Sequence, residues 1–391
     1  MFSRASTIAS KAAVPALNHS SVLHQPPTSP RITATQQQPF ATLRKPTAVA
    51  GANGSQGTAY VAQVLTAGNP VVAITQTGTK FEQGVPVTGV AEMMFKVGVT
   101  PHLTEVKYDA TPNPDEVSFI IGATKSNGVK TTIDAAPKGS RILLAQNGVD
   151  AMEGDRNDKT IAYAISTIVT NSLDKGGTEI TKGGKIQVGA NNPFLGELLK
   201  AFGDQKVFSV DVVKDIDQAK WEKIAMNCSM NTTCTAFGIT LSELTEHMSR
   251  DPRMKALVDG LAFEALQLAT AIGVNVNPHP KIMDNIAAIR LKFPGHPTSM
   301  QSDFNKNIAT EIPELTGGVA KQTEVIAKRD GTGIEAPLSS LISKCILELS
   351  EARKSYPSSE AFRSARADWV QAWQETLLDA TNKNITAPNI D

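Results

Sequence analysis

The chain has 391 residues, of which 41% are hydrophobic and 5% aromatic, and its 38 basic residues balance its 38 acidic residues. This length suggests two domains with an ample hydrophobic core. The lack of excess positive charge argues against a nucleic-acid binder and against a polybasic membrane patch. No apolar stretch approaches the roughly 18 uncharged residues of a transmembrane helix.

Cysteine and histidine usage restricts the chemistry further. The three cysteines, Cys228, Cys234 and Cys345, are too few for a disulfide framework. The six histidines are scattered along the chain, and none of them pairs with Cys228 and Cys234. We therefore expect reduced, buried thiols and no metal site.

The first 45 residues differ from the rest of the chain. They contain five basic residues and no acidic residue, so the remaining residues carry 33 basic against 38 acidic side chains, a net charge of −5. The segment is rich in Ser, Thr and Ala, and its prolines interrupt any long helix. This composition is typical of a mitochondrial transit peptide, which would place the protein in the matrix. A plastid address and a disordered tail without an address are the alternatives.

A glycine-rich turn between two strands comes next. The segment reads Gly51-Ala-Asn-Gly54-Ser-Gln-Gly57, after an apolar run at 47–50 and before a helix-compatible run at 58–67 and a β-branched strand at 70–75. Strand, glycine turn, helix and strand in about thirty residues make a βαβ unit. The glycines permit a tight turn and let a pyrophosphate approach the backbone at a helix N-terminus. We predict a dinucleotide site at Gly51, Gly54 and Gly57.

The residues after the second strand indicate which dinucleotide binds. An NAD site places Asp or Glu near the end of that strand, whereas an NADP site avoids this charge. Here no acidic residue occurs before Glu82. The sequence favours NADP, with Thr77 and Lys80 as candidate contacts of the phosphate.

Two further buried strands end in polar residues. The run at 117–125 ends in Lys125, and the run that starts at Arg141 ends in Gln-Asn147-Gly. Ligands of open α/β sheets lie at the carboxyl ends of the strands. Lys125 and Asn147 are thus candidates for contact with cofactor or substrate, although Asn-Gly alone often marks only a turn.

From Asp215 the pattern changes to long helices. Lys223, Asn227 and Asn231 recur at i, i+4 and i+8, which predicts one polar face rising about 6 Å per step on an otherwise apolar helix. Such a row is costly unless it meets a polar partner or forms a solvated face. A second helix is predicted from the Asp251-Pro252 cap to the region of Gly273.

Three separated segments resemble the ketopantoate reductase (2-dehydropantoate 2-reductase) family. They are Lys220-Trp-Glu-Lys223-Ile-Ala-Met-Asn227-Cys-Ser-Met-Asn231, Thr298-Ser299-Met-Gln-Ser-Asp303 and Thr310-Glu311-Ile312. The resemblance runs from about Thr47 to Glu351. It implies an α/β Rossmann-type domain at 46–212 and an all-α domain at 213–351 that is similar to the C-terminal domain of 6-phosphogluconate dehydrogenase. Residues 352–391 form an extension.

The resemblance also implies an activity, the NADPH-dependent reduction of ketopantoate to pantoate. Lys223 would be the general acid that protonates the carbonyl oxygen, and Glu311 would hold the terminal hydroxyl of the substrate. The other implied roles are substrate binding by Asn227, Asn231 and Ser299, a catalytic and cofactor contact by Asn147, a cofactor contact by Lys125, and structural support by Asp303.

The sequence departs from the family pattern at several positions. Ala52 stands where the first glycine of the family is expected, with Gly51 displaced by one residue, and Gln76 replaces a basic residue. Thr316 replaces an asparagine, and Pro313 is expected in the first turn of a helix capped by Thr310.

These departures keep other functions open. One alternative is a reductase for another branched 2-oxo acid, and another is a non-catalytic mitochondrial binding or assembly protein on the same fold. The expected partner is a small 2-oxo acid, and the expected state is a monomer or homodimer without membrane insertion. In the extension, Trp369, Trp373 and Leu377 predict an amphipathic helix that packs on the protein's own core or on a partner.

The targeting hypothesis has a direct test. A fluorescent protein fused behind residues 1–45 is expected to accumulate in mitochondria, because a cationic segment is drawn inward by a negative-inside potential. Microscopy of the same fusion with its five basic residues changed to Gln serves as the control. A wild-type fusion that stays cytosolic would remove the targeting claim.

Overall fold

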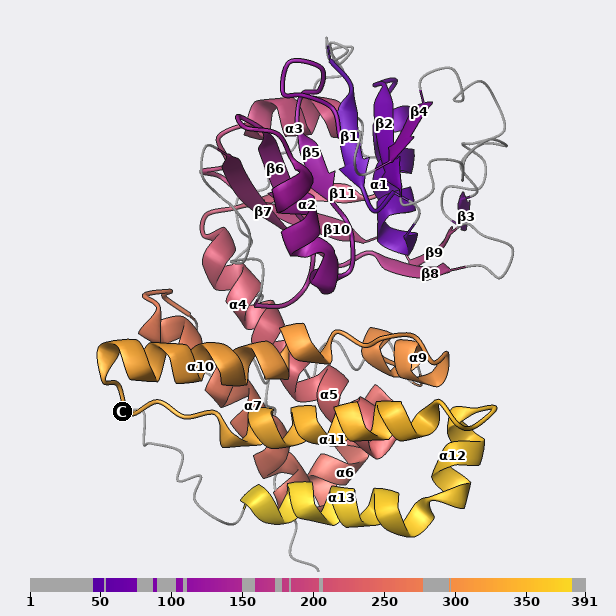
Figure 1. Ribbon diagram of the computed structural model, residues 1–391, viewed down its shortest axis with the longest axis vertical. Helices are drawn as coiled ribbons and strands as arrows, with labels where there is room; N and C mark the ends of the chain where they lie inside the picture. The colour runs from indigo at the N-terminus through magenta and orange to yellow at the C-terminus, as the bar shows by residue number, and fades with distance from the viewer. Residues whose placement is uncertain are drawn as a thin grey trace, which may run out of the picture. The chain divides into compact units, whose positions relative to one another are not determined.

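The computed structural model describes residues 45–52, 54–75, 87–89, 103–107, 111–149, 159–172, 178–182, 184–203, 207–276, 295 and 297–381 (Figure 1). Three sequence predictions lie outside these residues: the transit peptide up to residue 44, and the phosphate contacts Thr77 and Lys80. None of the described helices is long and apolar enough to cross a membrane.

Eight of the described strands form one sheet in the order β11-β10-β7-β6-β5-β1-β2-β4. Their bounds are β1 Thr47–Ala50, β2 Val71–Thr75, β4 Leu103–Lys107, β5 Ile120–Gly122, β6 Arg141–Leu144, β7 Thr160–Ser166, β10 Lys185–Gly189 and β11 Ser209–Val213. From β4 to β7 all neighbours are parallel, whereas β10 and β11 are parallel to each other and β10 pairs antiparallel with β7. This is the doubly wound strand order of a dinucleotide-binding domain, with its reversal between β1 and β5.

Alternate residues of β1 enter two different cores. Val49 packs with helices α1 (Ser55–Thr66) and α3 (Leu195–Phe202), whereas Ala48 and Ala50 pack on the side of α2 (Val129–Ala135). Helices on both faces explain why all four residues of β1 are buried. The strand predicted at 117–125 is shorter than expected: residues 113–117 form a turn, and the regular strand is confined to Ile120–Gly122.

A second, smaller sheet has the order β3-β9-β8. Its strands are β3 Val87–Gly89, β8 Val169–Ser172 and β9 Thr178–Lys182. The helix α1 lies against β8 and β9. This small sheet therefore extends the layer that covers one face of the large sheet.

The second half of the described chain is helical. Its elements are α4 Ile216–Met226, the π-helix η5 Asn227–Asn231, α5 Thr232–Phe237, α6 Leu241–Arg250, α7 Pro252–Ala271, α9 Ser299–Asn305, the 3-10 helix η6 Ile312–Glu314, α10 Thr316–Asp330, α11 Pro337–Arg353, α12 Ser359–Ala365 and α13 Ala367–Ala380. The predicted fold class, a Rossmann-type domain followed by an all-helical region, is confirmed.

The central helix α7 begins as predicted. The Asp251 side chain caps it by accepting a hydrogen bond from Arg253 N at 2.8 Å, and Pro252 occupies the first turn. Both faces of α7 are buried, so Glu264 is only 4% exposed. Its carboxylate accepts hydrogen bonds from Leu338 N and Ser339 N at 2.8 and 2.7 Å and thereby caps α11.

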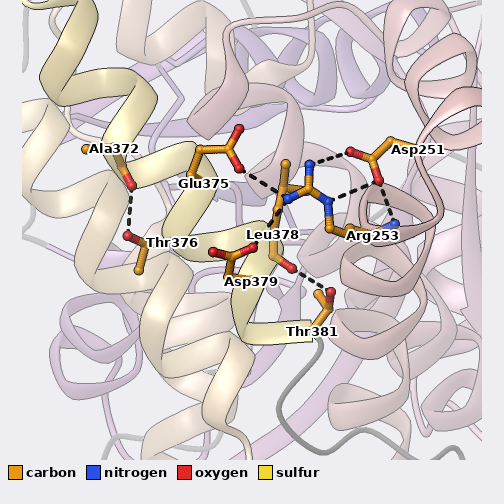
Figure 2. Close-up of polar contacts among 8 residues, drawn as sticks. All are labelled: Asp251, Arg253, Ala372, Glu375, Thr376, Leu378, Asp379 and Thr381. Atoms are coloured by element: carbon orange, nitrogen blue, oxygen red, sulfur yellow. Dashed lines mark hydrogen bonds and ion pairs between the residues drawn. The ribbon is translucent and has the colours of Figure 1, made fainter.

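The C-terminal helix α13 packs on the protein's own helical core, one of the two predicted alternatives. Leu377 is fully buried there, and Trp369 and Trp373 are partly buried. Figure 2 shows Arg253 of α7 between its own capping residue and two acidic residues of α13. Its guanidinium lies 3.2 Å from Glu375 Oε2 and 3.3 Å from Asp379 Oδ1.

Candidate active site

Four neighbouring parallel strands end at one edge of the large sheet. Beyond β1 lies Gly51, beyond β5 lie Thr124 to Ser126, beyond β6 lies Asn147, and β7 ends in Ser166. Because parallel strands bring their carboxyl ends together, four separate sequence segments meet there. The edge includes the point between β1 and β5 where the strand order reverses.

Gly51 makes the turn that leaves β1. Its φ of +75° lies in the region that favours glycine, and a Cβ at this position would come within 2.8 Å of Thr124 N. Ala52, which replaces the first glycine of the family pattern, is completely buried. The displacement of the glycine by one residue therefore leaves an intact tight turn.

The other two predicted glycines form the start of α1. A Cβ on Gly57 would lie 2.0 Å from Gly51 O, so this position admits only glycine unless the turn moves. Gly54 is the N-cap residue, without a side-chain cap, and the first turn of α1 holds no acidic residue. Backbone N–H groups at this end of α1 are thus available to an anion, as a pyrophosphate site requires.

Lys223 projects from α4 to the end of β7. Its ammonium donates a hydrogen bond to Ser166 O at 2.6 Å, and the side chain is half-buried. Burial lowers the pKa of Lys223 to about 8, and the negative charge of Glu311 opposes this shift. Lys223 is therefore still mostly protonated at neutral pH and loses its proton at a lower pH than an exposed lysine.

The carboxylate of Glu311 is held by the ends of β5 and β6. Ser126 Oγ lies 3.0 Å from Glu311 Oε1 and 2.6 Å from the carbonyl oxygen of Asn147. The carboxamide of Asn147 donates to Glu311 Oε2 at 3.2 Å. The predicted residues Asn147, Lys223 and Glu311 are thus brought together.

The local structure around Glu311 differs from the expected capped helix. Thr310 is not the cap, because Glu311 itself takes the N-cap position of η6, without a side-chain cap. Pro313 lies in this short 3-10 turn. Leu315, at φ −97° and ψ −105°, leaves the helical region, so α10 starts anew at Thr316.

Asn227 and Asn231 lie in a π-helical segment and not in a continuous α-helix. The prediction of one straight face at i, i+4 and i+8 is wrong here, because the wider π turn shifts the stagger of side chains. The two residues are 7% and 9% exposed. Among the described residues, no hydrogen bond of either carboxamide is found, so both polar groups are candidates for contact with a ligand.

Lys125 and Asp303 form an ion pair at 2.8 Å, and Lys125 also donates to Ala309 O at 3.0 Å. This contact connects the end of β5 with α9. Burial raises the pKa of Asp303, and Lys125 opposes that shift. The ion pair is consistent with the structural role expected for Asp303, and Ser299, the first residue of α9, is exposed.

Sequence reasoning missed Ser126, Ser166 and Thr124 at the strand ends. Ser126 is buried and contacts both Asn147 and Glu311, and Ser166 contributes only its backbone carbonyl. Ser126 and Thr124 could have been predicted, because they follow a buried strand and ligands lie at the carboxyl ends of strands. Ser166 could not, because any residue type provides the same backbone carbonyl.

Family models match both halves of the chain. The model described as ketopantoate reductase PanE/ApbA matches residues 47–193, and the model of the family's C-terminal domain matches residues 215–349. The chain belongs to the ketopantoate reductase family. It is therefore an oxidoreductase, and the alternative of a non-catalytic binding protein is not supported.

Individual relatives agree with this assignment of the reductase. A 2-dehydropantoate 2-reductase from Pyrobaculum aerophilum is 25% identical over 243 residues, which are 62% of this chain and 78% of that protein. A PanE/ApbA family ketopantoate reductase from Ralstonia eutropha JMP134 has a TM-score of 0.64 at 18% identity, over 79% of this chain and 99% of that chain. D-mandelate dehydrogenase in complex with NADH has a TM-score of 0.62 at 17% identity, over 78% and 99%. These two solved structures have the same fold as this chain.

The glycine turn yields a prediction. Gly57→Ala is expected to lower the affinity of the reductase for its nicotinamide cofactor about tenfold or more and to destabilise the fold by about 1–3 kcal/mol, because the new Cβ displaces the turn at Gly51. Calorimetric titration and thermal unfolding measure the two effects.

Gly196→Ala is the matched control. Gly196 lies in α3, and a Cβ added there would meet no atom within 4 Å, so alanine is expected to be neutral or to stabilise the fold by about 0.5–1 kcal/mol. Equal cofactor affinity in the two variants would contradict the role of Gly57.

Proposed function

We propose that the reductase converts ketopantoate to pantoate with NADPH and that Lys223 is the general acid. The observation that carries the proposal is the position of the Lys223 ammonium, which is half-buried and bound to Ser166 O at 2.6 Å at the end of β7. Burial lowers its pKa to about 8, and the nearby Glu311 carboxylate opposes this shift. A lysine on a solvated helix face would keep its usual pKa.

The proton is the contribution of the protein to the reaction. NADPH, when bound, supplies the hydride that adds to the 2-oxo carbon of the substrate. Negative charge then develops on the carbonyl oxygen, and the Lys223 ammonium donates its proton to that oxygen to complete the 2-hydroxy acid. The bond to Ser166 O holds the ammonium at the strand edge before the substrate arrives.

The remaining polar groups would bind the substrate. Each oxygen of Glu311 has a lone pair beyond the contacts with Ser126 and Asn147, so the carboxylate can accept a hydrogen bond from the terminal hydroxyl of ketopantoate. The carboxamides of Asn227 and Asn231, for which no hydrogen bond to another described residue is found, can donate to the carboxylate of the substrate. Ser299 would join them at the start of α9.

The preference for NADPH rests on the sequence after β2. No acidic residue follows Thr75 before Glu82, and Thr77 and Lys80 would contact the 2′-phosphate. The glycine turn and the open end of α1 fit the pyrophosphate, and Lys125 and Asn147 lie at neighbouring strand ends. NADPH is expected to bind more tightly than NADH in calorimetric titration, and equal affinity would contradict the roles of Thr77 and Lys80.

A different branched 2-oxo acid is the second candidate substrate. Thr316, which replaces an asparagine of the family pattern, is completely buried, and its hydroxyl lies 2.7 Å from Ser343 Oγ. A side chain engaged in this way is not available to the substrate. Comparison of kcat/KM across a set of 2-oxo acids decides between the candidates.

The catalytic assignment predicts the effect of removing Lys223. Purified residues 46–391 are expected to oxidise NADPH with ketopantoate, and Lys223→Ala is expected to lower kcat about 100-fold or more, because general acid catalysis contributes on that order. Absorbance at the NADPH band follows the reaction.

Lys220→Ala is the matched control on the same helix. Lys220 lies one turn earlier in α4, with its ammonium over the Tyr163 ring, and is outside the proposed site. A Lys223→Ala enzyme as fast as the Lys220→Ala enzyme would refute the general-acid role.

The pKa of Lys223 predicts the pH profile of the reduction. The ammonium must be protonated to act, so kcat/KM is expected to fall as pH rises through about 8. Glu311→Gln removes the negative charge that stabilises the ammonium, so this decline is expected to move to lower pH. A decline that stays at the same pH in Glu311→Gln, or that is absent from the wild type, would contradict the assignment.

A further inference from the structure

Two helices of the proposed substrate site, α5 and α9, contact the C-terminal segment of the described chain at their carboxyl ends. The segment from residue 352 to residue 381, called here the C-terminal segment, follows the family match, which ends at residue 349. It contains α12 and α13. Its contacts reach α5, which directly continues the π-helix of Asn227 and Asn231, and α9, which begins at Ser299.

Arg363 of α12 binds the carboxyl end of α5. Its Nη2 donates to Thr235 O at 2.7 Å and its Nη1 to Ala236 O at 3.4 Å. The last carbonyl groups of a helix have no partner within the helix and carry partial negative charge, so a guanidinium is well suited to them. Gly238 makes room for this contact, because a Cβ there would lie 2.5 Å from Arg363 Cζ.

The carbonyl bound by Arg363 is one step from a proposed substrate ligand. Thr235 is completely buried, and its hydroxyl donates to Asn231 O at 2.7 Å. A displacement at Thr235 is therefore passed to the backbone of Asn231. The π segment is sensitive to such a shift, because the direction of its side chains depends on a wider turn than that of the flanking helices.

The same arginine also contacts α9. Its guanidinium carbon lies 5.5 Å from the centre of the Phe304 ring, and Phe304 follows Asp303, the partner of Lys125. Phe362, the neighbour of Arg363, is fully buried and lies edge-on to Phe304 at 6.4 Å. One residue of the C-terminal segment thus touches both helices of the substrate site.

A second arginine also binds the carboxyl end of α9. Arg353, the last residue of α11, is 4% exposed and donates to Asn305 O at 3.0 Å and to Tyr356 O at 2.7 Å. It therefore binds the final turn of α9 to the beginning of the C-terminal segment. Because Asn305 ends the helix that starts with Ser299, α9 is fixed at its carboxyl end.

We propose that the C-terminal segment positions the substrate-binding helices and that Arg363 is the positioning residue through which it does so. The inference rests on the proposed function, because it takes Asn227, Asn231 and Ser299 as ligands of the 2-oxo acid. Arg363 touches neither substrate nor cofactor. Its effect is confined to the orientation of α5 with η5 and of α9.

The segment offers an internal control. Arg253 also attaches the C-terminal segment, through the ion pairs with Glu375 and Asp379 (Figure 2), but it binds α13 and not the site helices. Comparison of Arg363→Met with Arg253→Met separates loss of positioning from general loosening of the segment. Arg363→Lys keeps the charge and part of the donor set.

The test uses the full-length protein and two readouts. In Arg363→Met, KM for ketopantoate is expected to rise about tenfold, as for the loss of one charge-assisted hydrogen bond. The dissociation constant of NADPH is expected to be unchanged, and Arg363→Lys should recover part of the loss. Hydrogen–deuterium exchange is expected to speed up at 226–238 and 299–306 in Arg363→Met, whereas Arg253→Met should affect only 367–380.

Three outcomes would overturn the proposal. The first is a KM increase in Arg363→Met no larger than that in Arg253→Met. The second is a loss of NADPH affinity in Arg363→Met as large as its increase in KM for ketopantoate. The third is unchanged hydrogen–deuterium exchange at 226–238 in Arg363→Met. A wild-type protein without turnover would defeat the proposed function alone. The exchange comparison needs no substrate, and in that case it supports or overturns the positioning role by itself.

Discussion

The carboxylate of Glu311 is the interaction on which the site depends. It is held by Ser126 and Asn147, at the ends of two neighbouring strands, although it belongs to a turn of the helical half. A partly buried carboxylate is costly unless its oxygens are paired, and here the residues after the strand ends supply the donors. The same negative charge raises the pKa of the Lys223 ammonium, which burial alone would lower further. One side chain thus joins sheet to helices and helps to set the protonation of the proposed acid.

Other links support this connection between the two halves. Val149 N donates to Glu314 O at 2.8 Å, and Gly148 has a φ of +95° and no room for a Cβ beside Glu314. Lys125 reaches Asp303 on α9 from the end of the adjacent strand. Both contacts arise where parallel strands stop, since the last residues of such strands present backbone and side-chain polar groups to whatever covers the edge.

In the helical half, the two asparagines of the proposed site lie in an irregular segment. The π-helix at 227–231 separates α4 from α5, so the two asparagines have orientations that a straight helix would not provide. Such a local irregularity is stable only when its surroundings fix it. From the C-terminal side, the buried Thr235 hydroxyl donates to Asn231 O, and the Arg363 guanidinium donates to Thr235 O and lies over the Phe304 ring.

The sequence alone predicts hydrophobic periodicity, strand ends and helix caps, because these features depend on neighbours within a few residues. The glycine turn, the strands at 70–75 and from Arg141, and the Asp251 cap follow from local sterics and hydrogen bonding, and a resemblance in three segments indicated Lys223 and Glu311. Only the tertiary structure decided that Glu311 and not Thr310 takes the N-cap position of a 3-10 turn, that Asn227 and Asn231 lie in a π-helix, and that Arg363 binds the end of α5. These features require partners 100 or more residues away in the chain, or a competition between hydrogen-bonding patterns of nearly equal energy. A local pattern contains no information about such partners.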